Sequence, residues 1–180
     1  MATSWRIVKS RHASTAFDGE GARLYSGRWN SPGTRMVYTS RSVSLAVLEI
    51  LVHLRETALL SSYSLIAARF DDALIESLDH SRLPGNWRSY PALPELQRTG
   101  DEWVRSQRSA VLQVPSAVVE RESNYLLNPA HPDFSSVVIG EAEPFTFDER
   151  LLARPDEVSG RKQGDEGQRR ALGPLASIHE

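Results

Sequence analysis

The chain has 180 residues, a length that suits one compact domain with a buried core and not two. Its 40% hydrophobic and 24% charged residues are typical of a globular protein, and a formal net charge of −2 predicts no direct binding to nucleic acid or membrane. The absence of cysteine excludes disulfides, thiolate zinc sites and a cysteine nucleophile, and it fits a cytoplasmic location.

Helices and short strands are predicted in an irregular order along the chain. In chain order we expect a strand at 5–8, a long loop or several turns at 11–34, a strand at 36–39, a helix from a Ser42 cap to about 56, a strand at 63–70, a short helix at 71–78, a mostly helical segment at 91–109, and strands at 110–114, 135–139 and 145–147. This mixture indicates an α+β fold rather than a doubly wound parallel sheet.

The composition changes near residue 152. From 154 onward the chain is rich in charge, Gly and Gln and almost free of aromatic and branched apolar residues. Such a segment cannot bury enough surface to offset the entropy of ordering it. We therefore predict one domain at 1–153 and a disordered tail at 154–180.

Residues 26–33, Ser-Gly-Arg-Trp-Asn-Ser-Pro-Gly, combine features of a phosphate-binding loop. Glycines let the backbone approach a ligand closely, Arg28 supplies a planar fork of donors, and Trp29 offers a face for stacking. An ordinary surface turn, in which Arg28 pairs with a carboxylate, explains the same residues. Spacing alone leaves both interpretations open.

A carboxylate interrupts the apolar helix predicted at 44–54. A buried Glu49 is costly unless it is paired or functional, and His53 follows it by one helical turn on the same face. Such an acid is typical of active sites, where its pKa is shifted or a cation holds it. The structural alternative is an ion pair with Arg28 or Arg55.

The stretch 114–132 gathers polar side chains between prolines. Ser123, Asn124, Asn128 and His131 either contact a ligand or form the scaffold of a turn. No metal site is predicted, because the five histidines show no paired ligand spacing. They are His12, His53, His80, His131 and His179.

Taken together, these segments resemble the RES domain, a family named for an Arg, a Glu and a Ser. The matching stretches are WRIV at 5–8, FDGEGARLYSGRWN at 17–30, VYTSRSVSLAVLEILVH at 37–53, GDEW at 100–103, LQVPSAVV at 112–119 and ESNYLLNPAHPDF at 122–134. The resemblance spans roughly residues 5–151. It implies an ADP-ribosyltransferase-like fold, with split small β-sheets around an NAD⁺ cleft and flanking helices.

The resemblance also implies a function. The expected protein is the toxin of a bacterial type II toxin–antitoxin system, which depletes NAD⁺ by cleaving the nicotinamide–ribose bond through hydrolysis or phosphorolysis. NAD⁺ would be its substrate, with no further cofactor. The alternative within the family is transfer of ADP-ribose to a protein, such as a phosphoribosyl pyrophosphate synthetase. The expected partner is an Xre-type antitoxin with a helix-turn-helix domain, in a higher-order complex.

By the same resemblance, Arg28, Glu49 and Ser123 are the residues that give the family its name, with Tyr38 as a fourth site residue. We expect Glu49 to stabilise the positive charge that develops on the ribose, Arg28 to bind phosphate or ribose, and Tyr38 to stack on nicotinamide. The other expected residues are Trp29, Ser123 and Asn124 as further contacts to the dinucleotide, and His53 as a support for Glu49.

Two interpretations from other classes are a binding module without catalytic activity and a toxin directed at nucleic acid. The net charge and the lack of a basic stripe before residue 154 argue against nucleic-acid binding. The presence of Arg28, Tyr38 and Glu49 together argues against an inactive module.

Overall fold

The computed structural model describes residues 1–52 and 62–151. The chain divides into two units, Met1–Thr146 and Phe147–Glu180, and the described part of the second holds the 3-10 helix η6, Glu149–Leu151. The tail predicted at 154–180 lies outside the described residues. Within the described ranges, no helix has both the length and the apolar character needed to cross a membrane.

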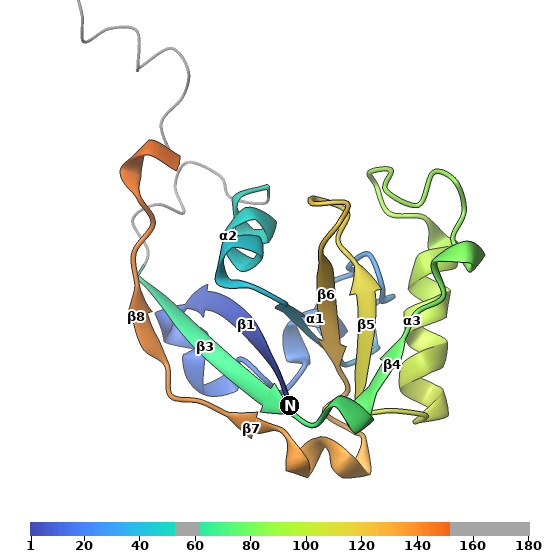
Figure 1. Cartoon of the computed structure of the whole chain (residues 1–180), viewed down its shortest axis with the longest axis horizontal. Coiled ribbons are helices and arrows are strands. Elements are labelled where there is room, and N and C mark those ends of the chain that lie inside the picture. The colour runs from blue at the N-terminus through green and yellow to red at the C-terminus, as the bar shows by residue number, and fades with distance from the viewer. Residues whose placement is uncertain (53–61, 152–180) are drawn as a thin grey trace, which may run out of the picture. The chain divides into compact units, whose positions relative to one another are not determined.

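The first unit contains strands, α-helices and short 3-10 helices, as predicted for a mixed fold (Figure 1). The strands are β1 Ala2–Lys9, β2 Val37–Ser40, β3 Tyr63–Phe70, β4 Ile75–Ser77, β5 Val111–Pro115, β6 Ser123–Leu127, β7 Val138–Ile139 and β8 Glu143–Phe145. The helices are α1 Glu20–Leu24, α2 Val43–Leu51 and α3 Pro94–Ser106, with 3-10 turns η1 Ser10–Thr15, η3 Asp72–Leu74, η4 His80–Arg82 and η5 Pro132–Ser136.

The described strands form one curled sheet in the order β4-β5-β6-β2-β1-β3-β7, and β8 also pairs with β3. All pairings are antiparallel except that of β4 with β5. Strands β1 and β3 pair along their whole length, whereas β1 and β2 share only the register pair Trp5↔Ser40. Two separate small sheets were expected. The structure instead has one sheet whose halves nearly separate between β1 and β2.

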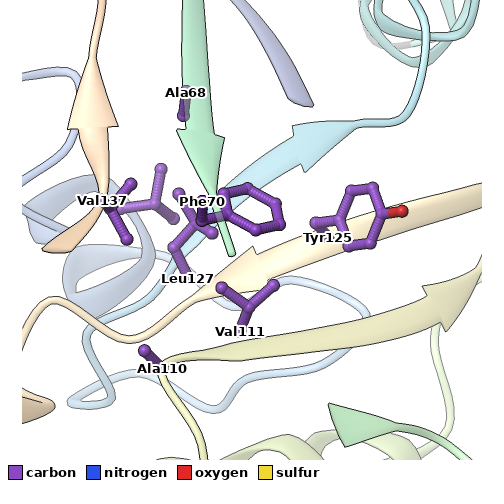
Figure 2. Close-up of a cluster of buried hydrophobic side chains, with 8 residues drawn as sticks. Ala68, Phe70, Ala110, Val111, Tyr125, Leu127 and Val137 are labelled. Carbon is purple, nitrogen blue, oxygen red and sulfur yellow. The ribbon is translucent and has the colours of Figure 1, made fainter. Parts of the chain in front are cut away.

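The two faces of the β2–β6–β5 half are both buried, because side chains alternate between them along each strand. On one face Leu112 and Leu126 pack with Leu96 and Trp103 of α3. On the other face Val111 and Leu127 join the cluster of Figure 2, where the rings of Phe70 and Tyr125 meet edge to face at 5.4 Å between centroids. The remaining members of that second cluster are Val37, Ala68, Ala110 and Val137.

Long-range strand pairing explains where the predicted elements were wrong. Residues 71–78 were expected to be a helix, but Ile75–Ser77 pairs in parallel with β5 after only one 3-10 turn. Strand β6 was not predicted, because it begins with polar Ser123 and Asn124 and its buried residues number only three. The strand expected at 135–139 begins as a 3-10 helix and pairs only at Val138–Ile139.

Candidate active site

A cleft of about 1100 Å³ opens in the first unit, where the two halves of the sheet separate. Its walls come from β1, β2, α2, the loop at 26–29, the loop at 88–92 and the β5–β6 turn. In Figure 1, α2, the tip of the β5–β6 hairpin and the loop before α3 stand side by side along this edge. The volume lies just above the usual range for small-molecule sites, so the cleft is large enough for a dinucleotide.

Arg28, Tyr38 and Glu49, which are far apart in sequence, all line this cleft. Arg28 comes from the loop after α1, Tyr38 from β2, and Glu49 from the last turn of α2. The structure therefore brings these three expected site residues together at one cleft. Among the described residues, no three side chains of the kind that bind metals lie close enough to hold an ion.

The position of Glu49 is fixed by the start and the packing of α2. Ser42 caps the helix by accepting a hydrogen bond from the Leu45 amide, as predicted, and buried Leu45 and Ala46 hold the helix on the sheet. Glu49 is partly exposed, and its Oε1 accepts hydrogen bonds from Ser116 Oγ at 2.8 Å and Asn124 Nδ2 at 2.6 Å. Within the described residues, no donor is bonded to Oε2.

An ion pair with Arg28 or Arg55 was the structural alternative for Glu49. No salt bridge joins Glu49 to Arg28 among the described residues, although the nearby carboxylate works to raise the pKa of Arg28. Burial is the larger effect, and the pKa of Arg28 is lowered as a result. The other candidates, Arg55 as a partner and His53 as a support, lie outside the described residues.

Arg28 holds a loop on the far wall of the cleft. Its Nη1 donates to the carbonyl oxygens of Trp87 at 2.6 Å and Ser89 at 3.2 Å. Within the described residues, Nε and Nη2 have no hydrogen-bond partner, so donors remain for a ligand. Arg28 therefore pairs with no carboxylate of residues 1–52 and 62–151, in contrast to the surface turn that was the structural alternative for it.

The hydroxyl of Tyr38 is committed to the loop that carries Arg28. It donates to Asn30 Oδ1 at 2.7 Å and accepts from the Trp29 amide at 3.1 Å. A Cβ atom on Gly27 would lie 2.5 Å from the hydroxyl oxygen of Tyr38, which explains why this position is a glycine. Burial raises the pKa of Tyr38 above its ordinary value. The phenol thus stays protonated. Tyr38 lines the cleft and also packs against the buried cluster that contains Trp29.

The ring of Trp29 was expected to offer a stacking face, but the structure buries it. Its side chain is only 2% exposed and packs with Met36, Leu96 and Trp103 in the core, so its ring is not a free face for stacking. The backbone of Trp29 lies so close to Gly100 of α3 that a Cβ there would collide with its carbonyl oxygen. Trp29 anchors the loop through its buried ring, yet it is also among the residues that line the cleft, so its contact to the dinucleotide stays a prediction.

The serine that contacts Glu49 is Ser116, whereas Ser123 was the serine expected to contact the dinucleotide. Ser123 Oγ accepts from Gln113 Nε2 at 3.1 Å, and neither serine is among the described residues that line the cleft. Asn124, the neighbour of Ser123, does line the cleft and binds Glu49. Ser123 and Asn124 are adjacent in β6, so their side chains point to opposite faces of the sheet. The stretch 112–119 that contains Ser116 matched the family pattern, but no role was predicted for this serine.

Arg6 is a cleft residue that sequence reasoning missed, because it lies inside a strand that reads as structural. Its Nη1 donates to the Tyr38 carbonyl at 2.6 Å, across the gap between β1 and β2. Its Nε and the Oδ1 of Asn124 are buried and have no partner within the described residues. Burial lowers the pKa of Arg6 to about 10, against a smaller opposing effect of Asp18.

Comparison with known proteins gives consistent relatives over nearly the whole described chain. A protein named Toxin Res, from Yersinia enterocolitica, is 41% identical over 149 residues, which are 82% of this chain and 97% of its own. A Prs ADP-ribosylating toxin from a Sphingobium species is 36% identical over 160 residues, or 86% of this chain and 99% of its own.

A solved structure extends the likeness to the fold. The M. tuberculosis MbcT–MbcA toxin–antitoxin complex contains a chain that matches with a TM-score of 0.64 at 18% identity, over 81% of this chain and 84% of that one. A sequence model described as RES domain matches residues 3–148. On the extent of that match and the identities of its relatives, the chain belongs to the RES domain family.

Proposed function

We propose that this protein is the toxin of a bacterial toxin–antitoxin system, acting in the cytoplasm, and that it cleaves the nicotinamide–ribose bond of NAD⁺. The observation that carries the proposal is the convergence of Arg28, Tyr38 and Glu49 on one cleft of dinucleotide size. Relatives at 35–41% identity are named Toxin Res, which supports the toxin role. The near separation of the sheet beside this cleft supports an ADP-ribosyltransferase-like fold.

Glu49 is the residue to which we assign the chemistry. When nicotinamide leaves, it takes the electron pair of the C–N bond, and positive charge develops on the ribose. A fixed carboxylate beside the ribose lowers that barrier. Oε1 is held by Ser116 and Asn124, so Oε2 is the oxygen available to bind a ribose hydroxyl or to accept a proton from the incoming nucleophile. Water or phosphate then forms the new bond to the ribose carbon.

Polar residues that line the cleft offer the substrate its remaining contacts. A buried donor or acceptor left without a partner costs about 1–3 kcal/mol, so a ligand that reaches Arg6 Nε or Asn124 Oδ1 would stabilise these atoms by pairing with them. Arg6 and Arg28 supply donors suited to phosphate or ribose oxygens. Asn124 Oδ1 accepts from a hydroxyl or amide, groups that the nicotinamide riboside half of NAD⁺ carries.

The test is nicotinamide release from NAD⁺ by wild type and Glu49→Gln. Glutamine keeps the size of the side chain and an oxygen to accept from Ser116, so this variant isolates the charge. We expect a loss of about a hundredfold or more with an unchanged circular dichroism spectrum. A folded Glu49→Gln protein that releases nicotinamide at the wild-type rate would contradict the proposal. Comparing turnover with and without phosphate separates phosphorolysis from hydrolysis.

ADP-ribosyl transfer to a protein is the second candidate, and the name of the Sphingobium relative favours it. The same cleft serves both reactions, because only the acceptor differs. Labelled NAD⁺ incubated with cell lysate distinguishes them: label on a protein indicates transfer, and free ADP-ribose indicates hydrolysis. By analogy with the MbcT–MbcA complex, we also propose an antitoxin partner, expected to be of the Xre type.

A further inference from the structure

A second set of cleft residues lies on the loop at 84–93, between η4 and α3, and the proposed chemistry does not use them. Arg28 fixes this loop from one side by donating to the carbonyls of Trp87 and Ser89. From the other side, Arg88 Nε donates to the Ala117 carbonyl at 3.1 Å and its Nη1 lies 3.3 Å from Glu120 Oε2. The loop is therefore held in a defined position beside the β5–β6 turn.

The loop brings a second guanidinium to the cleft that contains Arg28. Arg28 and Arg88 both line the cleft, and the charge of Arg88 contributes to lowering the pKa of Arg28. Two like charges held near one another repel unless an anion lies between them. Within the described residues, Nη2 of Arg88 has no hydrogen-bond partner, so both side chains keep donors suited to phosphate oxygens.

Tyr90 lines the cleft, yet it is 85% exposed, which makes it one of the most exposed large side chains of the described chain. Its neighbours Ser89 and Arg88 are fixed, so the loop presents the ring without burying it. An aromatic ring presented in this way is a typical stacking surface for a nucleobase, because every base has a π-face.

We propose that Arg88 and Tyr90 form a subsite for the adenosine diphosphate half of the substrate. The pyrophosphate binds between the guanidiniums of Arg28 and Arg88, and the adenine stacks on the ring of Tyr90. This inference rests on the proposed function, since it assigns the other half of the same dinucleotide. It makes the loop at 84–93 the element that distinguishes a dinucleotide from a mononucleotide.

The test is calorimetric titration of the full chain with two separate probes, ADP and nicotinamide mononucleotide. We expect Tyr90→Ala to raise the Kd of ADP by roughly tenfold or more and Tyr90→Phe to leave it unchanged, because phenylalanine keeps the ring. Arg88→Gln should weaken ADP binding and reduce its dependence on salt. The Kd of nicotinamide mononucleotide should be the same in wild type and both Tyr90 variants.

The matched control is Tyr25→Ala, an exposed tyrosine that does not line the cleft, and it should bind ADP as wild type does. The subsite is overturned if ADP does not bind wild type, or binds Tyr90→Ala equally well. It is also overturned if Tyr90→Ala weakens both probes alike, since that reports a collapsed loop. Nicotinamide release from NAD⁺ is a separate measurement, so failure of the proposed reaction remains distinguishable from failure of the subsite.

Discussion

Ser116 has only one direction in which it can donate, and that direction is toward Glu49. Its Oγ accepts hydrogen bonds from the amides of Val118 at 3.1 Å and Val119 at 3.0 Å. These bonds occupy its lone pairs, so its single proton goes to Glu49 Oε1, 2.8 Å away. The side chain is fully buried, which keeps water from competing. The β5–β6 turn thus orients the carboxylate of another element.

Ser116→Ala is expected to slow NAD⁺ cleavage while leaving the chain folded. A hydrogen bond to a charged group contributes about 1.5–3 kcal/mol, so kcat/KM should fall by roughly ten- to a hundredfold. The measurement is steady-state nicotinamide release. The control is Ser123→Ala, whose hydroxyl bonds only to Gln113 among the described residues and which should retain wild-type activity. The reverse ranking of the two variants would show that the serine of the site is Ser123.

Arg6→Lys is expected to impair both the cleft and the sheet. Arg6 Nη1 donates to the Tyr38 carbonyl, at the junction where β1 and β2 share a single register pair. A lysine has one ammonium group in place of the planar guanidinium, so it cannot keep that bond and also donate to a ligand in the same geometry. We expect a rise in KM for NAD⁺ of roughly tenfold and a lower thermal midpoint. The control is Arg11→Lys, a change at an exposed residue outside the cleft. An unchanged KM would assign Arg6 a purely structural role.

The contrast between predicted and observed site residues has a physical explanation. Arg28 and Glu49 stand out locally, as a charge among glycines and an acid in an apolar helix, and the resemblance to the RES domain implied both of them together with Tyr38. Arg6 and Ser116 have ordinary neighbours and acquire their roles through partners more than 30 positions away. Contacts of that kind depend on strand register, which a single sequence does not fix.

The same reasoning applies to the fold. Strand β3 at Tyr63–Phe70 and the Ser42 cap were predicted correctly, because alternation and capping are local signals. Strand β4 and the narrow junction between β1 and β2 are set by pairing with distant strands. The burial of the Trp29 ring has a related cause: a tryptophan beside an arginine suits a ligand site, but Leu96 and Trp103 of the distant helix α3 pack against it.

Tyr38→Phe is expected to cost stability in a pH-dependent way. Loss of the hydroxyl leaves the Trp29 amide and Asn30 Oδ1 short of a partner, at a cost of about 1–3 kcal/mol near neutral pH. The pKa of Tyr38 is raised in the folded protein, so above pH 10 the unfolded chain loses this proton while the folded chain keeps it. The unfolded state then binds fewer protons, and the stability from Tyr38 declines as pH rises.

The corresponding measurement is urea unfolding of wild type and Tyr38→Phe between pH 8 and about pH 11. The difference between the two proteins isolates Tyr38 and cancels the contribution of Tyr63, whose pKa burial also raises. The advantage of wild type should be constant up to pH 10 and shrink above it. A difference that stays constant, or grows, across the alkaline range would show that the hydroxyl is not buried as described.

Gly100→Ala tests whether α3 positions the loop that carries Arg28. Gly100 lies against the backbone of Trp29, and a Cβ at position 100 would collide with the Trp29 carbonyl oxygen. Because that oxygen belongs to the backbone, no change of side-chain rotamer can relieve the collision. Overpacking of this kind costs about 1–3 kcal/mol. We expect lower stability and reduced nicotinamide release, because the displaced loop also carries Arg28 and the amide that binds Tyr38.

The matched control for that experiment is Gly21→Ala in α1, where a Cβ would meet nothing within 4 Å. An alanine in a helix is favoured over glycine, so this variant should gain about 0.5–1 kcal/mol and keep full activity. If Gly100→Ala behaved like Gly21→Ala in thermal unfolding and in turnover, the close approach of α3 to Trp29 would have no role in placing Arg28. The position of Arg28 would then depend on its hydrogen bonds to Trp87 and Ser89 and on the bonds of Tyr38 to the same loop.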